Sequence, residues 1–371
     1  MGRILTGEQF RRTQRAAPAG VTFERLVASE SFANFDISQL HVNYALTNMS
    51  IAYSNAQFMA EWVAPVVPSD KASNDYYVYG FERFMHRDVH RAPGARPAET
   101  GWTVAPFPFK CDGRSVRGWY PWEAPSAADP AIDLDVDTTE VATDQVLLDQ
   151  EINLVEELKA NLTTIDLSAN SGANQLDNAN ADPVLYFDLQ KETIAKAIGR
   201  RPNSMVFGRP GWRAFRNNPL VLKHIFGTNV VGTGQQITTE MAKALLEVDD
   251  IQIAEAMYNT AVEGATPTLD YIWGDNVLLY YRDPGAGRRK LNLATTFLWD
   301  IALPAQTGEQ AEKLNGWIVE KWYDRNKKRM NIDVTKYFDQ VLTASGAGLL
   351  YKNTSSTDAG GEPGAAGTAT P

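Results

Sequence analysis

Two histidines, His86 and His90, stand four residues apart, which is the spacing at which two imidazoles on one helical face can share a metal ion. Their surroundings have the composition of a strand rather than a helix, and the glutamate of the zinc-protease motif is missing. The pattern therefore favours two solvated histidines on a hairpin over a metal site.

Other short motifs imitate nucleotide chemistry without completing it. His86-Arg87-Asp88 resembles the catalytic loop of protein kinases, but Pro93 stands where that loop requires asparagine. The glycine pairs in Gly232-Thr-Gly234 and Gly285-Ala-Gly287 complete neither a dinucleotide-binding pattern nor a Walker sequence. Surface turns are the better interpretation of both, and no nucleotide cofactor is expected.

Cys111 is the only cysteine, so no intrachain disulfide can form and a reducing compartment is indicated. The thiol has no convincing catalytic partner, and an ordinary strand cysteine is the expectation. The acidic run 129–137 has the composition of a calcium loop but lacks the spacing and glycine of an EF-hand. The motifs thus predict no catalytic residue, no cofactor and no metal.

The composition and net charge indicate the broad class of protein. The chain has 371 residues, 44% of them hydrophobic, and a net charge of −10. These values indicate a protein with a real core in one to three domains, and they argue against non-specific nucleic-acid binding by the chain as a whole. The first 25 residues lack the apolar core of a signal peptide, and no apolar run approaches the roughly 18 residues of a membrane span.

A long helix is predicted from Asp137 to Leu162. Asp137 suits the N-cap position, and Glu140 three residues later resembles a capping box. At 1.5 Å per residue the helix would be on the order of 38 Å long, with a strongly acidic outer face. Apolar residues recur along it at helical spacing: Leu148, Ile152, Val155, Leu158 and Leu162.

Before this helix, residues 75–125 predict a long hairpin. Tyr76–Phe84 and Trp102–Lys110 have strand composition, and Ala92–Gly101 reads as the loop between them. Pro106 and Pro108 place the returning strand at an edge. Because an isolated two-stranded hairpin is at best marginally stable in water, this one must lie on another surface.

After the long helix the pattern predicts an α/β unit. Asp182-Pro183 begins a helix that ends near Gly199, and Ser204–Gly208 is a short buried strand. Further helices and strands follow as far as Asp283. Trp317–Tyr323 and Met330–Phe338 predict a second hairpin, whose tip is Asp324–Arg329.

Charge is segregated along the chain. Residues 76–118 hold seven basic and four acidic residues, a balance of +3, whereas residues 129–166 hold eleven acidic residues and Lys159, a balance of −10. The basic hairpin could dock on the acidic helix of its own chain or on that of another copy. Complementary electrostatic fields of this kind determine how two surfaces are oriented and which partner is bound, more than how tightly they bind.

The order of these parts resembles the major capsid proteins of tailed bacteriophages with the Hong Kong 97 coat fold, over about residues 40–340. The resemblance rests on the joint order of four stretches: Leu46–Gly80, Asp133–Leu154, Ile198–Arg209 and Ile253–Ala261.

It implies an α+β fold with an N-terminal arm at 1–62 and an extended loop with its base at 63–128. A peripheral domain would comprise 129–182 and 300–351, with its spine helix at 137–162 and a β-sheet. An α/β axial domain would occupy 183–299, and a flexible tail 352–371.

The function implied is structural and not enzymatic. Pentamers and hexamers would assemble into an icosahedral head that encloses double-stranded DNA, with contacts to DNA that are non-specific. A scaffolding protein, a portal and decoration proteins are the expected partners, with no membrane and no cofactor. The protein would belong to the virion capsid and assemble in the bacterial cytoplasm. Two alternatives are an encapsulin-like nanocompartment shell and a cytosolic α/β enzyme.

The candidate site residues are therefore contacts. We expect the hairpin to lie across a neighbour's acidic helix and the tip 325–329 to meet other copies, while the basic arm would hold a scaffold or face DNA. The candidate inter-subunit residues are Arg83, Arg87, Arg91, Arg96, Arg114, Arg117, Asp144, Asp149, Glu151, Glu156, Arg325, Lys327, Lys328 and Arg329. The candidate arm residues are Arg3, Arg11, Arg12 and Arg15.

Overall fold

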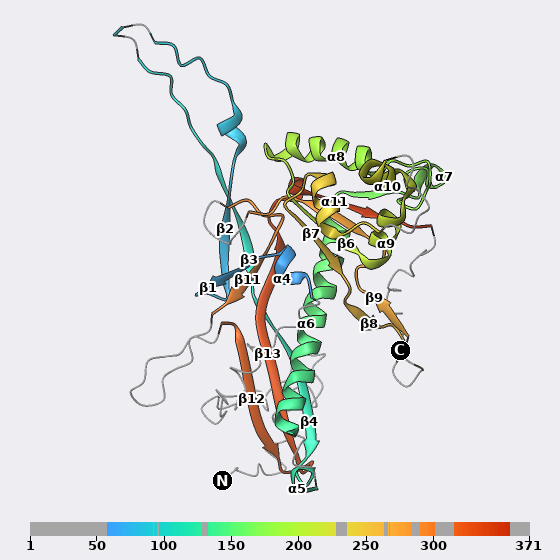
Figure 1. The fold of residues 1–371 in the computed structure, drawn as a ribbon. Coiled ribbons are helices and arrows are strands. Elements are labelled where there is room, and N and C mark those ends of the chain that lie inside the picture. The colour runs from blue at the N-terminus through green and yellow to red at the C-terminus, as the bar shows by residue number, and fades with distance from the viewer. Residues whose placement is uncertain are drawn as a thin grey trace, which may run out of the picture.

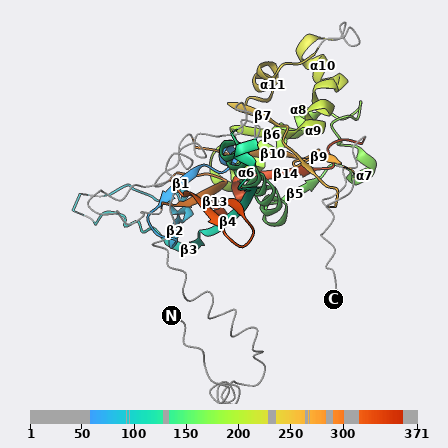
Figure 2. The same cartoon turned by 90° about the horizontal axis from the view of Figure 1, so that it is seen from below.

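The computed structural model describes residues 58–91, 93–94, 96–127, 133–227, 236–262, 266, 268–283, 290–300 and 315–356. The expected basic arm and the expected tail beyond residue 356 lie outside these ranges. The main parts of the described chain are two five-stranded sheets, one long helix, a group of shorter helices and one long hairpin whose far end projects from the body (Figures 1 and 2). None of the helices in these ranges is both long and apolar enough to cross a membrane.

The long helix α6 spans Leu134–Asn161 and runs along the first sheet to the second (Figure 1). Its N-cap is Asp133, whose side chain accepts hydrogen bonds from the backbone N–H groups of Asp135 and Val136. The predicted N-cap at Asp137 is therefore wrong by about one turn. Each aspartate between residues 133 and 137 is favourable at a helix N-terminus, so the composition alone did not identify which of them is the N-cap.

The buried face of α6 differs in part from the predicted stripe. Val155 and Leu158 are buried as expected, but Leu148 and Ile152 are only half-buried. The face that packs inward also carries polar residues, because it lies against strands at one end and against the second sheet's core at the other. Its buried members are Thr139, Ala142, Thr143, Val146, Leu147, Gln150, Glu151, Leu154, Val155 and Leu158.

The first sheet has the order β1-β11-β13-β12, and β4 also pairs with β13. Its strands are β1 (Val66–Ser69), β4 (Asp112–Pro121), β11 (Ala294–Trp299), β12 (Trp317–Asp324) and β13 (Arg329–Leu342). The antiparallel pair β12–β13 confirms the predicted second hairpin. One face of this sheet packs on α6 through a small core that includes Val146, Val319 and Val334.

The second sheet has the order β5-β14-β10-β6-β7. Its strands are β5 (Thr164–Asp166), β6 (Ser204–Gly208), β7 (Asp250–Ala254), β10 (Val277–Tyr280) and β14 (Gly348–Lys352). The larger core of the molecule lies here, where Phe187, Phe207 and Phe215 pack edge to face or tilted. Helices pack around this core: α7 (Ala169–Gly172), α8 (Pro183–Ile198), α9 (Arg209–Asn217), α10 (Pro219–Phe226) and α11 (Thr239–Leu246).

Capping residues explain where these helices begin and end. Asp182 caps α8, with proline at the first helical position, and Gly199 ends the helix at φ +73°. Asn218 caps α10, which begins at Pro219 directly after the end of α9. These local signals, like the buried strand Ser204–Gly208, are confirmed.

Three strands pair across the predicted domain boundaries. β11 falls in the segment 183–299 assigned to the axial domain, but it pairs with β1 and β13 in the first sheet. β5 and β14 fall in the segments assigned to the peripheral domain, but they pair in the second sheet. Strand pairing joins residues far apart in the sequence, so a boundary drawn along the chain cannot follow it.

The remaining elements are short. α4 (Ala60–Val63) packs against α6, α5 (Ala124–Ala127) follows β4, and η3 (Ser345–Ala347) precedes β14. β8 (Met257–Asn259) and β9 (Leu269–Tyr271) form a small hairpin. The predicted long hairpin comprises β2 (Ser73–Tyr79), the short helix η2 (Phe81–Phe84) and β3 (Val104–Lys110).

Candidate interaction surfaces

The long hairpin, residues 73–110, is called the outrigger below. Its root is fixed by a ladder of aromatic rings on β11. Phe109 stacks on Phe297 with ring centroids 4.1 Å apart, and Tyr76 stacks on the same ring at 5.7 Å. Phe107 stacks on Tyr76 in turn, at 5.6 Å. The ladder explains how a two-stranded hairpin keeps its place without a core of its own.

Beyond this root the outrigger exposes large apolar side chains. Val89 is 83% exposed, and Trp102 is 67% exposed although it stacks on Tyr79 with ring centroids 5.7 Å apart. The full set of exposed large hydrophobic residues here is Tyr77, Val78, Phe81, Phe84, Met85, Val89, Trp102 and Phe107. Their concentration on one projecting element makes the outrigger a large exposed apolar surface of the described chain.

The outrigger also presents cations. Arg91 and Arg96 are exposed, and Arg87 is exposed while it donates a hydrogen bond to the Glu99 carbonyl at 2.7 Å across the loop. The side chain of Arg83 lies outside the described residues. Arg87, Arg91 and Arg96 are thus placed where a second molecule can reach them.

One ring of the outrigger rests on the second sheet's domain. A Cβ added to Gly199 would lie 2.3 Å from Cζ of Phe84, so the phenyl ring sits directly over this glycine at the end of α8. The glycine is needed twice, for its positive φ and for this close approach. The ring remains 65% exposed, so its other side is free to contact a partner.

Two of the predicted contact arginines meet acids of their own subunit. Arg114 forms a 2.7 Å ion pair with Asp149 on α6. Arg117 binds Asp333 through two hydrogen bonds, of 2.6 and 2.7 Å, and lies over the Trp322 ring. Only Arg114, on β4, thus meets the acidic helix of its own chain, while Arg117 meets β13, and how the cations of the outrigger dock stays a prediction.

Glu151 requires a correction, because it is fully buried and cannot be a surface contact. Its Oε2 accepts hydrogen bonds from the N–H groups of Met59 (2.9 Å) and Ala60 (2.6 Å), and its Oε1 accepts one from the Trp273 indole (2.5 Å). Burial raises the pKa of Glu151 to about 7, outweighing these three hydrogen bonds, which lower it. On the same helix Glu156 is exposed and Asp144 is half-buried.

A second buried charge, missed by the sequence analysis, lies beside Glu151. Lys336 on β13 is 1% exposed, and its Nζ donates to Gln150 at 2.6 Å and to Glu61 at 2.8 Å. The ammonium also lies over the Trp317 ring, 4.8 Å from its centroid. Burial lowers the pKa of Lys336. Its position between Thr335 and Tyr337 in an alternating strand was the only signal available, and alternation alone does not say which face is buried.

The tip of the β12–β13 hairpin carries the other predicted cations. Arg325, Lys327 and Lys328 are exposed, whereas Arg329 is half-buried and lies over the Trp119 ring at 5.2 Å. Two further aromatic side chains, Trp122 and Tyr323, are partly exposed next to it and meet edge to face. The tip thus combines cations with aromatic rings, a composition common in interface centres.

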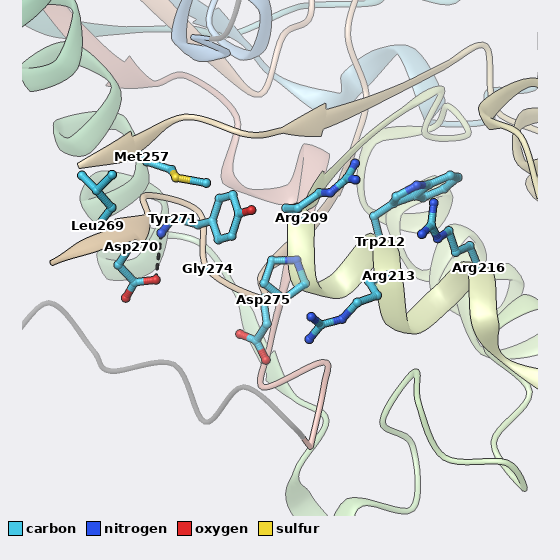
Figure 3. A pocket seen from close by; sticks show the side chains of 11 residues that line it. Arg209, Trp212, Arg213, Arg216, Met257, Leu269, Asp270, Tyr271, Gly274 and Asp275 are labelled. Carbon is cyan, nitrogen blue, oxygen red and sulfur yellow. Dashed lines mark hydrogen bonds between the residues drawn. The ribbon is translucent and has the colours of Figure 1, made fainter. Parts of the chain in front are cut away.

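A pocket of about 430 Å³ lies between α9 and the β8–β9 hairpin. Figure 3 shows Arg209 beside Tyr271, whose ring lies next to the side chain of Met257, while Arg213 and Arg216 lie further along α9. Arg209 is paired with Glu255 at 2.7 Å, so the basic wall is partly neutralised. The pocket is small and open, and it holds no arrangement of a nucleophile and a base.

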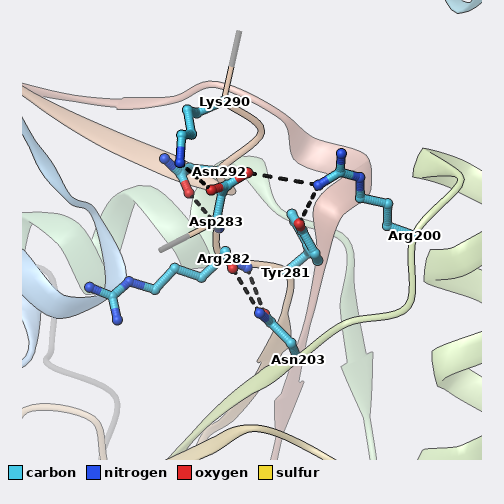
Figure 4. Close-up of polar contacts among 7 residues, drawn as sticks. All are labelled: Arg200, Asn203, Tyr281, Arg282, Asp283, Lys290 and Asn292. Atoms are coloured by element: carbon cyan, nitrogen blue, oxygen red, sulfur yellow. Dashed lines mark hydrogen bonds and ion pairs between the residues drawn. The ribbon is translucent and has the colours of Figure 1, made fainter. Parts of the chain in front are cut away.

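A polar cluster closes the base of the chain segment between Asp283 and Lys290. Lys290 binds Asp283 at 2.7 Å, and Arg200 lies 3.7 Å from the same carboxylate while it donates to the Tyr281 hydroxyl at 2.5 Å (Figure 4). Asn203 accepts from the N–H of Arg282 and donates to its carbonyl. These contacts fix the two ends of the segment, while Gly285-Ala-Gly287 and Gly232-Thr-Gly234 lie outside the described residues, so the interpretation of both as surface turns stays a prediction.

Cys111, His86 and His90, which were first considered for catalysis or metal binding, lie in different surroundings. Cys111 is buried, and burial raises the pKa of its thiol to about 11, so it stays protonated. His86 and His90 are exposed on the outrigger. Within the ranges described, no three His, Cys, Asp or Glu side chains gather in a way that could hold a metal ion.

Comparison with known proteins agrees with this picture. No family model matches the chain. The major capsid protein of Burkholderia phage BcepMu is 28% identical over 248 residues, which are 65% of this chain and 76% of that protein. The major capsid protein of Pseudomonas phage JBD67 is 24% identical over 321 residues, which are 83% of this chain and 95% of that protein.

Among solved structures, a phage-related protein from Bordetella bronchiseptica RB50 has the same fold, with a TM-score of 0.62 and 20% identity over 85% of this chain and 98% of that one. The outrigger, the long helix and the two sheets are the parts that the Hong Kong 97 coat fold requires. The resemblance to phage major capsid proteins and the fold expected from the sequence are confirmed.

Proposed function

We propose that this chain, a relative of phage major capsid proteins, is the structural subunit of a capsid shell and has no catalytic activity. The observation that carries the proposal is the outrigger. It projects from the body, it is fixed at its root by the rings on Phe297, and it exposes eight large apolar side chains. A subunit that folds alone gains nothing from such an element, whereas an assembling subunit buries it.

Charge supports the choice of partner. The outrigger presents Arg87, Arg91 and Arg96, while α6 exposes acids such as Asp137 and Glu156. Copies of one chain that carry both surfaces can make repeated head-to-tail contacts, which close into rings such as pentamers and hexamers. Exposed ion pairs contribute about 0–1 kcal/mol each, so the apolar contacts supply most of the affinity and the charges set the orientation.

The remaining partners follow from the kind of particle. An acidic shell protein attracts packed double-stranded DNA weakly, which suits a container that must be filled and emptied. The arginines of residues 1–25 suit a reversible, salt-sensitive contact with a scaffolding protein or with DNA. A portal and decoration proteins complete the proposed set of partners, in a virion assembled in the bacterial cytoplasm.

An encapsulin-like compartment would use the same subunit contacts to enclose proteins instead of DNA. The curated relatives are phage capsid proteins, and this favours the phage shell. The cytosolic enzyme is disfavoured, because the pocket at α9 has no catalytic set and the Cys111 thiol is buried and protonated.

Electron microscopy of the purified chain, alone and co-expressed with the neighbouring head genes, tests the proposal. We expect closed shells or rings, and DNA inside particles from an infected host. A chain that stays monomeric under every condition would contradict the proposed function, and particles filled with enzyme would select the compartment instead.

The outrigger is tested by reversing three exposed cations, Arg87→Glu, Arg91→Glu and Arg96→Glu together. We expect a folded subunit that no longer assembles. The matched control reverses Lys196, Arg201 and Lys223, which are also exposed and change the net charge by the same amount. Normal assembly of the outrigger variant would show that its cations are not contacts.

The basic tip is tested separately with Lys327→Glu and Lys328→Glu. Both side chains are exposed and neither has an ion pair among the described residues, so the subunit should fold normally. If the tip meets carboxylates of other copies, assembly yield should fall and become more sensitive to salt. Unchanged yield and salt tolerance would assign the tip to solvent.

A further inference from the structure

We propose that the outer edge of β2, and not that of β3, receives an extended segment of a second copy of this chain by main-chain hydrogen bonding. The inference rests on the proposed shell function and specifies how the outrigger is bound. It follows from the direction of the backbone groups in the two strands.

Two hydrogen bonds establish which backbone groups face outward. Gly80 donates its N–H to the Thr103 carbonyl, so even-numbered residues of β2 and odd-numbered residues of β3 face each other. Lys110, at the other end of β3, donates its N–H away from β2 to the Asp339 carboxylate at 2.9 Å. Even-numbered residues of β3 therefore point their backbone groups outward, and so do their partners on β2.

Prolines occupy two successive outward positions of β3. Pro106 pairs with Tyr77 and Pro108 pairs with Asp75, and neither proline has an N–H to offer. The next outward donor, that of Lys110, is taken by Asp339. This edge of β3 keeps its carbonyl acceptors, but of its four outward residues only Val104, at the far end, retains an N–H for an added strand.

The opposite edge has no such protection. Asp75 and Tyr77 each point an N–H and a carbonyl outward, and no described strand pairs with β2 on that side. Tyr77 is 62% exposed, and Asp75 carries the only charge within Ser73–Tyr79. Natural proteins usually block an open edge with charge, proline or a bulge, and here only one of the two edges is blocked. The asymmetry directs pairing to β2.

Charge complementarity identifies the occupant as a second copy. The outrigger holds five basic and four acidic residues, a balance of +1, and exposes Arg87, Arg91 and Arg96, whereas residues 129–166 have a balance of −10 and expose Asp137 and Glu156. A surface that complements the exposed cations is therefore present on every other copy. A third strand also removes the weakness of a two-stranded hairpin, because three strands with an apolar face are stable where two are marginal.

Single-residue hydrogen exchange provides the direct test. In the unassembled subunit, the amides of Tyr76 and Val78 should be protected by pairing with β3, and those of Asp75 and Tyr77 should exchange freely. In assembled particles the exchange of Asp75 and Tyr77 should slow by about tenfold or more. Unchanged exchange at these two amides in particles would overturn the proposal, whatever happens to the side chains.

Proline substitution is the second test, because a proline at an outward position removes an edge donor without breaking the β2–β3 ladder. Tyr77→Pro and Asp75→Pro should each slow assembly by about tenfold, the effect of one lost hydrogen bond. The matched controls Tyr77→Ala and Asp75→Ala remove the same side chains and keep the N–H. The difference in assembly rate between each proline variant and its alanine control therefore measures the effect of the lost main-chain hydrogen bond. Equal rates for each proline and alanine pair would contradict edge pairing.

The reciprocal variants Pro106→Ala and Pro108→Ala restore donors to the edge of β3. They should leave the rate of correct assembly within about twofold and raise the fraction of misassembled particles, because a second edge becomes available. Failure of this proposal is distinguishable from failure of the proposed function: proline variants that form normal shells refute edge pairing alone, whereas a wild-type chain that forms no shell refutes the function itself.

Discussion

The Trp273 indole N–H donates to the Glu151 carboxylate at 2.5 Å, inside the subunit. Glu151 lies on the long helix and Trp273 lies just before β10 of the second sheet, so this bond joins the two main parts of the molecule. The other oxygen of the same carboxylate binds the start of α4 through Met59 and Ala60. One acidic side chain thus holds together the helix, the second sheet and the point where the described chain begins.

Replacing Glu151 by glutamine should destabilise the subunit. The amide keeps one acceptor oxygen and turns its N–H₂ group toward a donor, so at least one of three buried donors loses its partner. Such a loss costs about 1–3 kcal/mol. Urea unfolding at pH 8, where the carboxyl is ionised, measures it, with the exposed Glu156→Gln as the control. Equal midpoints for Glu151→Gln and wild type would show that the hydrogen bonds are dispensable.

The same residue predicts a pH dependence. The pKa of Glu151 is about 7 in the folded subunit and about 4.5 in the unfolded chain, so the folded state binds more protons between these values. Its contribution to the free energy of unfolding therefore falls as the pH rises from about 4.5 to 7, by roughly 3 kcal/mol in total.

Comparing the pH profiles of wild type and Glu151→Gln isolates this contribution from all other titrating groups. The difference in stability between the two proteins should shrink as the pH rises through that range. A difference that stays constant, or that grows with pH, would contradict a raised pKa at this carboxyl.

Gly199→Ala should destabilise the subunit for two reasons. The residue has φ +73°, where a side chain is strained by about 1 kcal/mol or more, and the new methyl group would collide with the Phe84 ring. Gly346→Ala is the control, because its nearest neighbour would be 3.5 Å away. Adding Phe84→Ala to Gly199→Ala should restore only the stability that was lost to the steric collision, as measured by thermal unfolding. Complete recovery of the stability would mean that the backbone strain is absent.

Phe297→Ala should release the outrigger. The ring is 7% exposed and carries both Phe109 and Tyr76, so its loss should cost about 3–5 kcal/mol. Cleavage within residues 85–103 by a low concentration of protease should become faster. Phe107→Ala, which removes a ring that is 45% exposed and is not stacked on β11, should change the cleavage rate far less. Equal cleavage of the two variants would place the anchor elsewhere.

Lys336→Met should be tolerated better than Lys336→Ala, by about 2 kcal/mol. Methionine keeps the packing of the stem on Trp317 and removes a buried charge, whose desolvation opposes folding. Both variants remove the ammonium that donates to Gln150, but alanine also leaves a cavity. Thermal unfolding of the two variants measures the difference, and a methionine variant less stable than the alanine variant would contradict a stabilising contact of the stem with Trp317.

Local structure was largely predictable. Asp182 and Gly199 delimit α8 as their capping preferences require, and Ser204–Gly208 is a buried strand. The outrigger and the hairpin with its tip at Asp324–Arg329 also follow from alternation and turn residues. The start of the long helix was misplaced because Asp133 and Asp137 have the same capping preference and only the three-dimensional structure selects one.

What the sequence by itself determined is the set of elements and their charges, because helix caps, periodicity and turn chemistry act within a few residues. The tertiary structure decided which charge meets which. Arg114 meets Asp149, Arg117 meets Asp333 across 216 positions, and Glu151 leaves the acidic surface for the interior. Pairing over such separations depends on how strands and the helix pack, and burial then sets the pKa of Glu151. No local pattern encodes either.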